Sequence, residues 1–506
     1  MVADVATSYD LLPYSSKPYA LTHPDNLATI AGLAGLRVPS LERCRVLELG
    51  CGAGGNLIPM ALSVPGGTFV GIDLSRRQIA DARSLAGALG LGNIDFRTVD
   101  ITDVDQSLGR FDFIICHGVF SWVPAAVQRS ILALCRRNLR PDGVAFVSYN
   151  CYPGWHLKGL VRDILLHGVR RDGEPQKRVQ DARSVLEAVS RRVTNRKDSY
   201  GRLLRDEVRK VAGASDTYLF HEYLEDVNQP FYFHEFVEIA AAHGLRYLAD
   251  AKSRIDARTT GDRVKHEQEL DFLVMRSFRR SLLCHGDVRL DPAVGAATLR
   301  DCHARARARP VSTAPDVGSD RVEDFQTPAG KLWSTSSRLD KALLVTVARR
   351  HPATLSFLEL AEEVGRLADT GPGAHGLAEG LRRCWAAEMI DLQLHPPRLP
   401  ERIAERPTAS PLARMQARKG ADVTNLRHHT VELDPVAQAM LDFLDGTHDR
   451  ADLAAELGVL AEEEAPSNLP EGEDASRPGS ARWREDIDGS LERMLRYFQR
   501  SALLMS

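Results

Sequence analysis

Between residues 45 and 149 of this 506-residue chain, short apolar runs alternate with longer amphipathic stretches. The short runs predict strands at 46–49, 68–72, 94–99, 111–116 and 144–149. The longer stretches predict one helix that begins at residue 57 and two others at 75–89 and 125–139. Such an alternation of strands and helices is typical of a parallel sheet covered by helices on both faces.

The pattern changes after the fifth predicted strand. Residues 157–240 predict helices with their charges on one face, for example at 179–193 and 201–211. Two further strands are expected at 245–249 and 270–275, and they would complete a seven-stranded sheet with one antiparallel member. The helical insert therefore interrupts the sheet where a segment that covers a substrate would lie.

The rest of the chain predicts small helical domains. Residues 300–309, RDCHARARAR, are basic but lack interleaved aromatic side chains, which favours a solvated helix face over a nucleic-acid patch. The polar stretch 311–330 is expected to be a linker. Three predicted helices and a strand then follow in the order of a winged helix, at 339–350, 356–367, 377–389 and 391–395.

A second unit of the same kind is expected to begin at residue 435 and to be split by a disordered loop at 461–482. The candidate recognition helix of the first unit carries only Arg382 and Arg383 as basic residues, so protein contact or homodimerisation is favoured over DNA binding. The expected domains are an N-terminal arm (1–44), an α/β domain (45–300, with the insert and a further region at 157–300), the linker, and winged-helix-like domains at 331–400 and 401–506.

Composition limits the partners and the cellular compartment that are expected for this chain. A net charge of −3 gives no general attraction to nucleic acid or to an anionic membrane. The eight cysteines are scattered without a C-x-x-C pair, so neither a disulfide framework nor a metal site is indicated. The N-terminus lacks the basic and apolar regions of a signal peptide, and no run reaches the length of a membrane span. These features predict a cytoplasmic protein.

A glycine-rich turn follows the first predicted strand in the segment VLELGCGAGGN, residues 46–56. Glycines at such a turn allow the backbone to approach a ligand closely. Gly50, Gly52 and Gly55 also match the spacing of dinucleotide-binding folds, so the glycines alone do not identify the ligand. They indicate a cofactor site at this end of the sheet.

Three acidic residues follow three successive predicted strands. Glu48 lies where a pyrophosphate would meet a like charge, whereas a cationic ligand such as S-adenosylmethionine would tolerate the acid. Asp73 suits a ribose diol, and Asp100 beside Ile101 suits an adenine amino group and ring. The three acids favour S-adenosylmethionine. The alternative is an α/β core whose strand ends happen to be acidic.

The segments after the fourth and fifth predicted strands are rich in aromatic side chains. They read CHGVFSWVP at 116–124 and SYNCYPGWH at 148–156. Ligands of such sheets bind at the carboxyl ends of the strands, so these aromatics indicate the walls of a narrow channel. Structural packing of the same aromatics is the competing interpretation. The proline- and tyrosine-rich segment 9–25 is expected to be either a cover over the cofactor or an ordinary surface extension.

Several segments resemble one family of enzymes. They are PYSS near the start, ELGCGAGGNLIPMA, FVGIDLS, FDFIICHGVFSWVP and VSYNCYPGWH, with FHEYLEDVNQPFYFHEFVEIA at 220–240 and ELDFLVMRSFRRSLLCH at 269–285. These segments are similar to class I methyltransferases that carry a methyltransferase regulatory domain, among them bacterial outer-membrane-protein lysine methyltransferases. The resemblance implies a Rossmann-like seven-stranded sheet, the cofactor S-adenosylmethionine and a protein substrate. One departure is Cys151, where a small polar residue is expected.

We expect methyl transfer to protein lysine side chains, with a small-molecule N- or O-methyltransferase and a non-catalytic sensor of S-adenosylmethionine as alternatives. A sequence N-P-P-Y, typical of methyltransferases acting on nucleobases or glutamine, is absent after the fourth strand, where SWVP stands. The residues expected at the acceptor are Tyr149, Tyr152, Trp155 and His156. The residues expected to bind the cofactor are Tyr14, Ser15, Glu48, Gly50, Cys51, Gly52, Asn56, Asp73, Leu74, Asp100, Ile101, His117, Gly118 and Trp122, with no metal.

Overall fold

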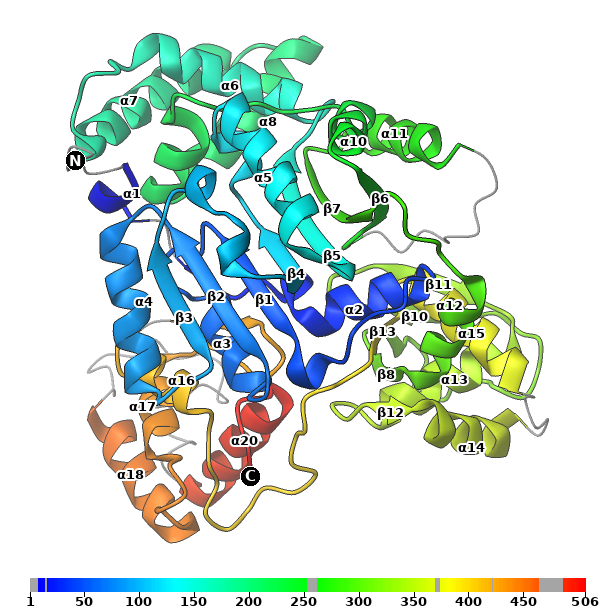
Figure 1. Ribbon diagram of the computed structural model, residues 1–506. Coiled ribbons are helices and arrows are strands. Elements are labelled where there is room, and N and C mark those ends of the chain that lie inside the picture. Colours follow the sequence, from blue (N-terminus) through cyan, green and yellow to red (C-terminus); the bar gives the residue numbers. More distant parts are fainter. Residues whose placement is uncertain (1–7, 14–15, 253–261, 369–373, 421, 464–485) are drawn as a thin grey trace. The chain divides into compact units, whose positions relative to one another are not determined.

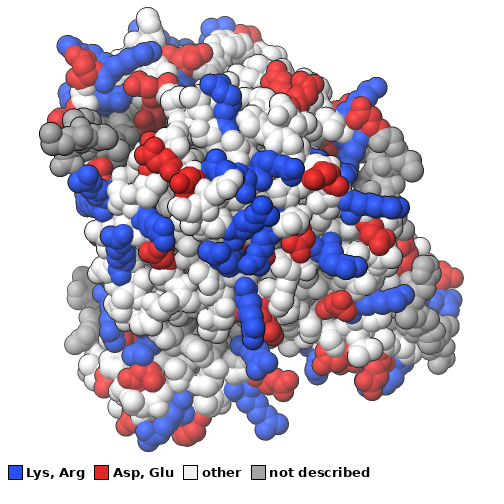
Figure 2. All heavy atoms as spheres, viewed as in Figure 1, with Lys and Arg blue, Asp and Glu red and all other residues white. Residues whose placement is uncertain are grey.

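The computed structural model describes residues 8–13, 16–252, 262–368, 374–420, 422–463 and 486–506 (Figure 1). The chain divides into two compact units. The first comprises residues 1–16 and 30–292, and the second comprises residues 17–29 and 293–506. Each unit is described by itself below. Basic and acidic side chains are interspersed over the face seen in Figure 2, in keeping with the small net charge.

A seven-stranded sheet forms the centre of the first unit among the described residues. Its strands are β1 Arg45–Leu49, β2 Thr68–Asp73, β3 Ile94–Thr98, β4 Phe111–Cys116, β5 Leu139–Asn150, β6 Leu245–Asp250 and β7 Phe278–His285. Their order is β3-β2-β1-β4-β5-β7-β6, and only β7 runs antiparallel to its neighbours. The predicted Rossmann-like sheet with one antiparallel member is therefore confirmed.

The helices of the first unit follow the predicted alternation. They are α1 Ser8–Leu11, α3 Leu57–Ser63, α4 Arg76–Ala88, α5 Ala125–Asn138, α6 Trp155–Gly168, α7 Pro175–Val193, α8 Ser199–Ala212, α9 Asp216–Leu219, α10 Phe233–Ala242 and α11 Arg263–Val274, while α2 Pro24–Leu33 crosses the division between the units. Helix α4 begins where its N-cap Ser75 accepts a hydrogen bond from the Gln78 N–H. The helices α6 to α9 make up the predicted insert after β5.

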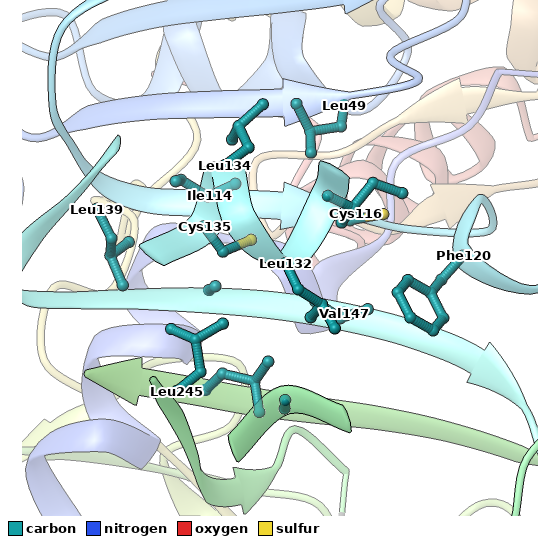
Figure 3. Packing of buried hydrophobic residues seen from close by; sticks show 14 of the residues in the cluster. Leu49, Ile114, Cys116, Phe120, Leu132, Leu134, Cys135, Leu139, Val147 and Leu245 are labelled. Atoms are coloured by element: carbon teal, nitrogen blue, oxygen red, sulfur yellow. The ribbon is translucent and has the colours of Figure 1, made fainter. Parts of the chain in front are cut away.

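One face of the sheet packs against α5 and α10. Alternate residues of the central strands, such as Leu47, Ile114 and Val147, share a fully buried cluster with Leu132 of α5 and Phe236 of α10 (Figure 3). The other set of alternate residues, which includes Glu48, faces away from this cluster. The parity of a residue in its strand therefore decides whether its side chain enters this core.

The seventh strand was predicted at the wrong place. Residues 270–275, expected to be a strand, lie at the end of helix α11 and just beyond it. The N-cap Asp262 of α11 accepts a hydrogen bond from the Lys265 N–H, and Phe272 is half exposed at 50%. The actual strand β7 places Arg279 in the interior, fully buried, so its sequence lacks the expected apolar alternation.

The second unit begins with short strands that were not predicted. Residues 303–306 form β8 His303–Ala306, and residues 309–310 form β9 Arg309–Pro310, so the expected solvated helix over 300–309 is wrong beyond the end of α12 Pro292–Asp301. Ala304 and Ala306 are buried, whereas Arg305 faces the other way and binds Asp391. The period of two in ARARA is that of a strand.

The expected linker also contains regular structure. Strand β10 Glu323–Gln326 pairs with β9 and with β11 Leu332–Thr335, and its Phe325 is fully buried. The second half of the segment 311–330 is therefore part of a small sheet, anchored by one aromatic side chain.

The three helices of the first small domain agree with their prediction. They are α13 Arg338–Arg349, α14 Phe357–Ala368 and α15 Ala374–Ala386, followed by β13 Ile390–Gln393. Strand β8 lies between β12 Leu355–Ser356 and β13 in a three-stranded antiparallel sheet. Helices α16 Pro411–Ala417, α17 Pro435–Phe443, α18 Arg450–Glu463 and α20 Ile487–Arg500 then share a second buried core, with a short hairpin of β14 Val423–Thr424 and β15 Thr430–Val431. Most of the predicted disordered loop, from 464 onward, lies outside the described residues.

Residues 17–29 belong to the second unit, contrary to their assignment to an N-terminal arm of the α/β domain. Asp25 accepts a hydrogen bond from the His395 N–H at 2.7 Å, and the rings of His23 and His428 lie 5.3 Å apart. The cysteines are all free and buried. Within the described ranges, no helix has the length and apolar character needed to cross a bilayer.

Candidate functional site

The glycine turn between β1 and α3 adopts a backbone that other residues rarely tolerate. Gly50, Gly52 and Gly54 have φ angles of +71°, +53° and +75°. A Cβ atom on Gly50 would lie 2.6 Å from Cγ2 of Val119, which is closer than atoms approach without displacement. The bare glycines therefore leave a close-fitting backbone cradle between the ends of β1 and β4, and the buried Cys51 lies within it.

Glu48 lies beneath this turn with one carboxylate oxygen unused. Its Oε1 accepts a hydrogen bond from Asn56 Nδ2 at 2.7 Å, and its Oε2 is buried without a hydrogen-bond partner among the described residues. Burial raises the pKa of Glu48 to about 8, although the Asn56 hydrogen bond opposes the shift, and nearby Asp73 adds to it. With a pKa of about 8, Glu48 is largely protonated at neutral pH, which differs from the charged carboxylate expected from the sequence.

Asp73 at the end of β2 holds the turn in place. Its Oδ2 accepts a hydrogen bond from the Gly52 N–H and its Oδ1 from the Ser75 N–H, each at 2.9 Å. Burial raises the pKa of Asp73, while these backbone hydrogen bonds oppose the shift. The next residue, Leu74, is exposed at 55%, so its apolar side chain is available to a ligand at the same edge.

Asp100 follows β3 at the same end of the sheet. Its Oδ1 accepts hydrogen bonds from the backbone N–H and the hydroxyl of Thr102, each at 2.8 Å. Ile101 is partly buried against the main core. The register Asp73↔Thr98 between β2 and β3 places Asp100 two residues beyond the level of Asp73, so the two acids lie along one edge.

His117 and Gly118 follow β4 and meet β5. Ser148 Oγ lies 2.9 Å from His117 Nδ1 and accepts a hydrogen bond from the Gly118 N–H at 2.9 Å. Burial, reinforced by Arg280, lowers the pKa of His117 to about 4, so this imidazole is neutral at physiological pH. A cationic ligand beside His117 would therefore meet no like charge from it.

Tyr149 does not join the other residues expected at the acceptor. It lies on the opposite face of β5 from Ser148, because successive side chains of a strand alternate. Its ring stacks on Phe236 at 3.9 Å, and its hydroxyl lies 3.1 Å from Ser281 Oγ within the core. Tyr149 is therefore a packing residue of the core, as the alternative interpretation of the aromatic loops proposed.

Tyr152, His156 and Tyr232 do come together beyond the end of β5. The Tyr152 and His156 rings stack at 4.2 Å, and His156 Nε2 lies 3.2 Å from the Tyr232 hydroxyl. The rings of Trp122 and Trp155, from the two aromatic loops, lie 6.0 Å apart with the edge of one ring facing the other. Burial is the main cause that raises the pKa of Tyr152, and the nearby Tyr232 adds to the shift, so this phenol stays protonated.

Two expected cofactor residues, Tyr14 and Ser15, lie outside the described residues. Their neighbour Ser16 accepts a hydrogen bond at Oγ from the Gly55 N–H of the glycine turn at 2.8 Å. Asp10 Oδ1 in turn accepts a hydrogen bond from the Ser75 hydroxyl at 2.5 Å. Ser16 therefore contacts the glycine turn, and Asp10 contacts the N-cap of α4.

Sequence reasoning missed Ser148, Ser121 and Asn150. Ser121 Oγ accepts a hydrogen bond from the Asn150 N–H at 2.9 Å and so joins the two aromatic loops. All three were within the quoted loops, but small polar residues give no signal beside five aromatics. Within the described part of the chain, no group of His, Cys, Asp and Glu could hold a metal ion.

The site fits a cationic, nucleoside-bearing ligand. A backbone cradle lies at Gly50, an unused carboxylate oxygen at Glu48, and further carboxylates at Asp73 and Asp100. The imidazole of His117 adds no positive charge at this end of the sheet, because its pKa is lowered to about 4. S-adenosylmethionine, which combines a sulfonium, an amino group and a ribose, is a ligand of this chemical kind.

Family models match three regions of the chain. A methyltransferase domain matches residues 40–206, a predicted methyltransferase regulatory domain matches 215–285, and the C-terminal winged helix domain of PKMT matches 405–503. The uncharacterized protein RP789 of Rickettsia prowazekii is 34% identical over 465 residues, which are 87% of this chain and 84% of that protein. The chain belongs to the class I S-adenosylmethionine-dependent methyltransferases with a regulatory domain.

A solved structure resembles the whole methyltransferase. PKMT2 from Rickettsia typhi in complex with AdoHcy has a TM-score of 0.83 and 27% identity, and the match covers 98% of this chain and all of that one. A second Rickettsia prowazekii protein, RP028, is 36% identical over 241 residues, covering 48% of this chain and 96% of its own. The methyltransferase therefore uses S-adenosylmethionine, and its residues 405–503 form a winged helix domain.

Proposed function

We propose that this methyltransferase transfers methyl groups to lysine side chains of proteins. The observation that carries the proposal is the extent of the likeness to PKMT2, which includes the insert and the regulatory region as well as the sheet. The loop after β5, the start of α6 and the regulatory region supply Tyr152, His156 and Tyr232, which would line the acceptor site. His156 is exposed, so a large substrate could reach this group from solvent.

The cofactor residues in this proposal are those around the glycine turn. Glu48 would face the positively charged part of the ligand, and Asp73 would bind the ribose hydroxyls with its remaining lone pairs. Asp100 with Ile101 would contact the adenine, and Ser16, which binds the Gly55 N–H, would lie beside the glycine turn that holds the cofactor. S-adenosylmethionine, when bound, supplies a methyl group on a positively charged sulfur.

The protein must present the lysine nitrogen unprotonated. The reference pKa of lysine is about 10.4, so a neutral amine at pH 7.4 costs roughly 4 kcal/mol. Aromatic surroundings disfavour the ammonium by removing water. Tyr152, Trp155 and Tyr232 would supply such surroundings, while His117, with its pKa lowered to about 4, is too weak a base to take up the lysine proton. The proton would therefore leave to water before the amine is enclosed.

A small-molecule methyltransferase is the second candidate. A ubiquinone biosynthesis O-methyltransferase of Actinobacillus pleuropneumoniae is 34% identical over 139 residues, but these are only 26% of this chain. Such a short match reflects a common methyltransferase core and does not bear on the acceptor. A third possibility is a non-catalytic sensor of S-adenosylmethionine, which would bind the cofactor without transferring its methyl group.

The test is incubation of the full chain with methyl-labelled S-adenosylmethionine and bacterial outer-membrane and cytoplasmic protein fractions. Proteolysis and mass spectrometry then locate the label. Methylated lysine in peptides is expected and would support the proposal. Label found only in small molecules would overturn it in favour of the second candidate, and binding without label would favour the sensor.

A further inference from the structure

Several buried polar atoms near the ends of β4 and β5 have no hydrogen-bond partner among the described residues. They are Asn150 Nδ2, Trp155 Nε1 and both side-chain atoms of Asn228. Asn150 and Trp155 are each only 2% exposed. Buried polar groups are nearly always paired, and leaving one unpaired costs about 1–3 kcal/mol. Such a group of unpaired atoms indicates a ligand that is not part of the chain.

The three residues are held around one segment, Ser121 and Trp122. The Asn150 N–H donates to Ser121 Oγ at 2.9 Å, and the Gln229 N–H, next to Asn228, donates to the Ser121 carbonyl at 2.8 Å. The Trp155 ring lies 6.0 Å from that of Trp122. Residues from β5, from the start of α6 and from the loop before α10 are therefore gathered at the segment that follows β4.

Asn150 also lies on the cofactor face of the sheet. The strand registers place Glu48, Ile115 and Phe146 in one row, and Ser148 and Asn150 follow Phe146 on the same face. Ser148 contacts His117, and the ring of Phe278, the register partner of Asn150, lies 6.2 Å from His117. The unpaired amide of Asn150 is thus on the same side as Glu48 and His117, and opposite to Tyr149.

The loop that carries Asn228 is fixed at both ends. Arg162 of α6 donates to the carbonyl oxygens of Glu225 and Asp226, while Gln229 is bound to Ser121 as described. The Phe231 N–H donates to the Asn150 carbonyl at 3.0 Å. Asn228 is therefore positioned by three separate elements, although its own side chain bonds to none of the described residues.

We propose that Asn228 and Asn150 position the acceptor lysine, with Asn228 Oδ1 accepting an N–H of the ε-amino group and Asn150 Nδ2 donating to a carbonyl of the substrate chain. Trp155 Nε1 is a second donor for that carbonyl. This inference rests on the proposed function and identifies the residues that recognise its substrate. A lysine residue in a polypeptide offers both the donor and the acceptor that these groups lack.

The unpaired atoms of Asn150, Trp155 and Asn228 are uncharged, whereas Arg162 Nη1, which is also buried without a partner among the described residues, belongs to a cation on α6. The uncharged character of the amides has a chemical consequence. A carboxylate would orient the amine equally well but would hold it as an ammonium, which has no lone pair. An amide oxygen accepts the same hydrogen bond with much less preference for the charged form. The charged groups on the neighbouring elements include Lys158, 5.3 Å from the Trp155 ring, Arg162, Asp163, Glu222, Glu225 and Asp226.

The test compares wild type with Asn228→Asp and Asn228→Leu. Its substrate is a lysine peptide that wild type methylates, and its binding is measured by calorimetry with S-adenosylhomocysteine present. At pH 7, Asn228→Asp should bind the cationic peptide about tenfold more tightly yet turn over at least tenfold more slowly, with the pH profile of kcat displaced to higher pH. Asn228→Leu should weaken peptide binding about tenfold, as should Asn150→Leu.

Opposite changes in binding and turnover are the signature of amine positioning, because a general loss of structure would weaken both. Asn195→Asp, at an exposed loop position, is the matched control and should change neither quantity. If wild type methylates the peptide and Asn228→Asp keeps the wild-type Kd, kcat and pH profile, the assignment is wrong. If wild type methylates no lysine at all, the proposed function itself fails.

Discussion

Asn56 Nδ2 donates a 2.7 Å hydrogen bond to one carboxylate oxygen of Glu48, and the other oxygen of Glu48 is buried without a partner in the described structure. The pair links the strand before the glycine turn to the residue at its end. Asn56 also fixes the orientation of the carboxyl group, so that the unused oxygen is held ready for a ligand group that donates a hydrogen bond or carries a positive charge.

Cofactor affinity should depend on pH through Glu48. Burial raises the pKa of Glu48 to about 8, so below that pH a cationic ligand must displace a proton from this group in order to bind the carboxylate. We expect the affinity for S-adenosylmethionine to rise from pH 6 to pH 8, by up to about tenfold per unit, and then to level off. Calorimetry at several pH values measures this slope.

Glu48→Gln removes the titrating group and should lower the affinity at pH 8 while flattening its pH dependence. The exposed Glu42→Gln should behave as wild type. The amino group of the ligand titrates in the same range, and its contribution remains in Glu48→Gln. A slope that is the same in wild type and Glu48→Gln would show that Glu48 is not the group responsible.

Asp73→Ala should weaken cofactor binding by about tenfold or more. The change leaves the N–H groups of Gly52 and Ser75 without their acceptor, and it removes the carboxylate proposed for the ribose. Each unpaired N–H costs about 1–3 kcal/mol if it remains buried. Titration calorimetry compares the variant with Asp95→Ala, an exposed acid of β3, which should bind normally. Equal affinities in the two variants would exclude the role of Asp73.

Gly50→Ala should lower both stability and cofactor binding. A φ of +71° disfavours an L-residue by about 1–2 kcal/mol, and the new Cβ would also lie 2.6 Å from Val119 Cγ2. The double variant with Val119→Ala should recover part of the loss, because it removes the clash but not the strain. Thermal unfolding measures these differences.

The control for Gly50 is Gly87→Ala on α4. Gly87 is exposed, and a Cβ there would meet no atom within 4 Å. The substitution should leave binding unchanged and stabilise the helix by about 0.5–1 kcal/mol. If Gly50→Ala were as well tolerated as Gly87→Ala, the turn would not have the rigid geometry described above.

Arg279→Leu should destabilise the first unit by about 3–5 kcal/mol. The guanidinium is fully buried and binds Asp271 at 2.7 Å and Glu267 at 2.9 Å, so its removal leaves buried carboxylates without their cation. Arg97→Ala, which breaks the exposed 2.7 Å pair with Asp95, should change the unfolding free energy by less than about 1 kcal/mol. Urea unfolding measures the unfolding free energy of both variants. Similar losses of unfolding free energy in Arg279→Leu and Arg97→Ala would contradict the prediction.

Arg279 also shows why strand β7 was hard to predict from the sequence. Strands β1, β2, β4 and β5 were predicted from apolar runs that are mostly buried, but β7 buries Arg279 and β8 alternates alanine with arginine, which obscures the expected apolar pattern. Conversely, the apolar residues 272–275 are exposed at the end of α11 and resembled a strand. Arg279 is buried with Asp271 and Glu267, and Arg305 binds the distant Asp391, so ion pairs stabilise these two strands where an apolar run would be expected.

The cofactor end of the site was more predictable than the acceptor end. Glu48 and Asp73 lie at the ends of β1 and β2 and Asp100 lies just beyond β3, so the predicted strands were enough to place these three acids at one edge of the sheet, while their roles in binding stay a prediction. For the aromatic residues, the function also depends on which face of the sheet the side chain occupies. A shift of one residue along a strand moves a side chain to the opposite face. Tyr149 and Asn150 are neighbours in sequence, yet they lie on opposite faces of β5, with Asn150 on the side of His117.

Tyr149→Phe should therefore leave methyl transfer nearly unchanged. The hydroxyl contacts Ser281 Oγ at 3.1 Å in the core, and its loss should lower the unfolding free energy by about 0.5–1.5 kcal/mol. Tyr232→Phe is the matched comparison, because its hydroxyl lies 3.2 Å from His156 Nε2 beside the proposed acceptor position. We expect Tyr232→Phe to reduce turnover severalfold with little loss of stability. A fall in turnover confined to Tyr149→Phe would instead return Tyr149 to the acceptor site and contradict the face assignment.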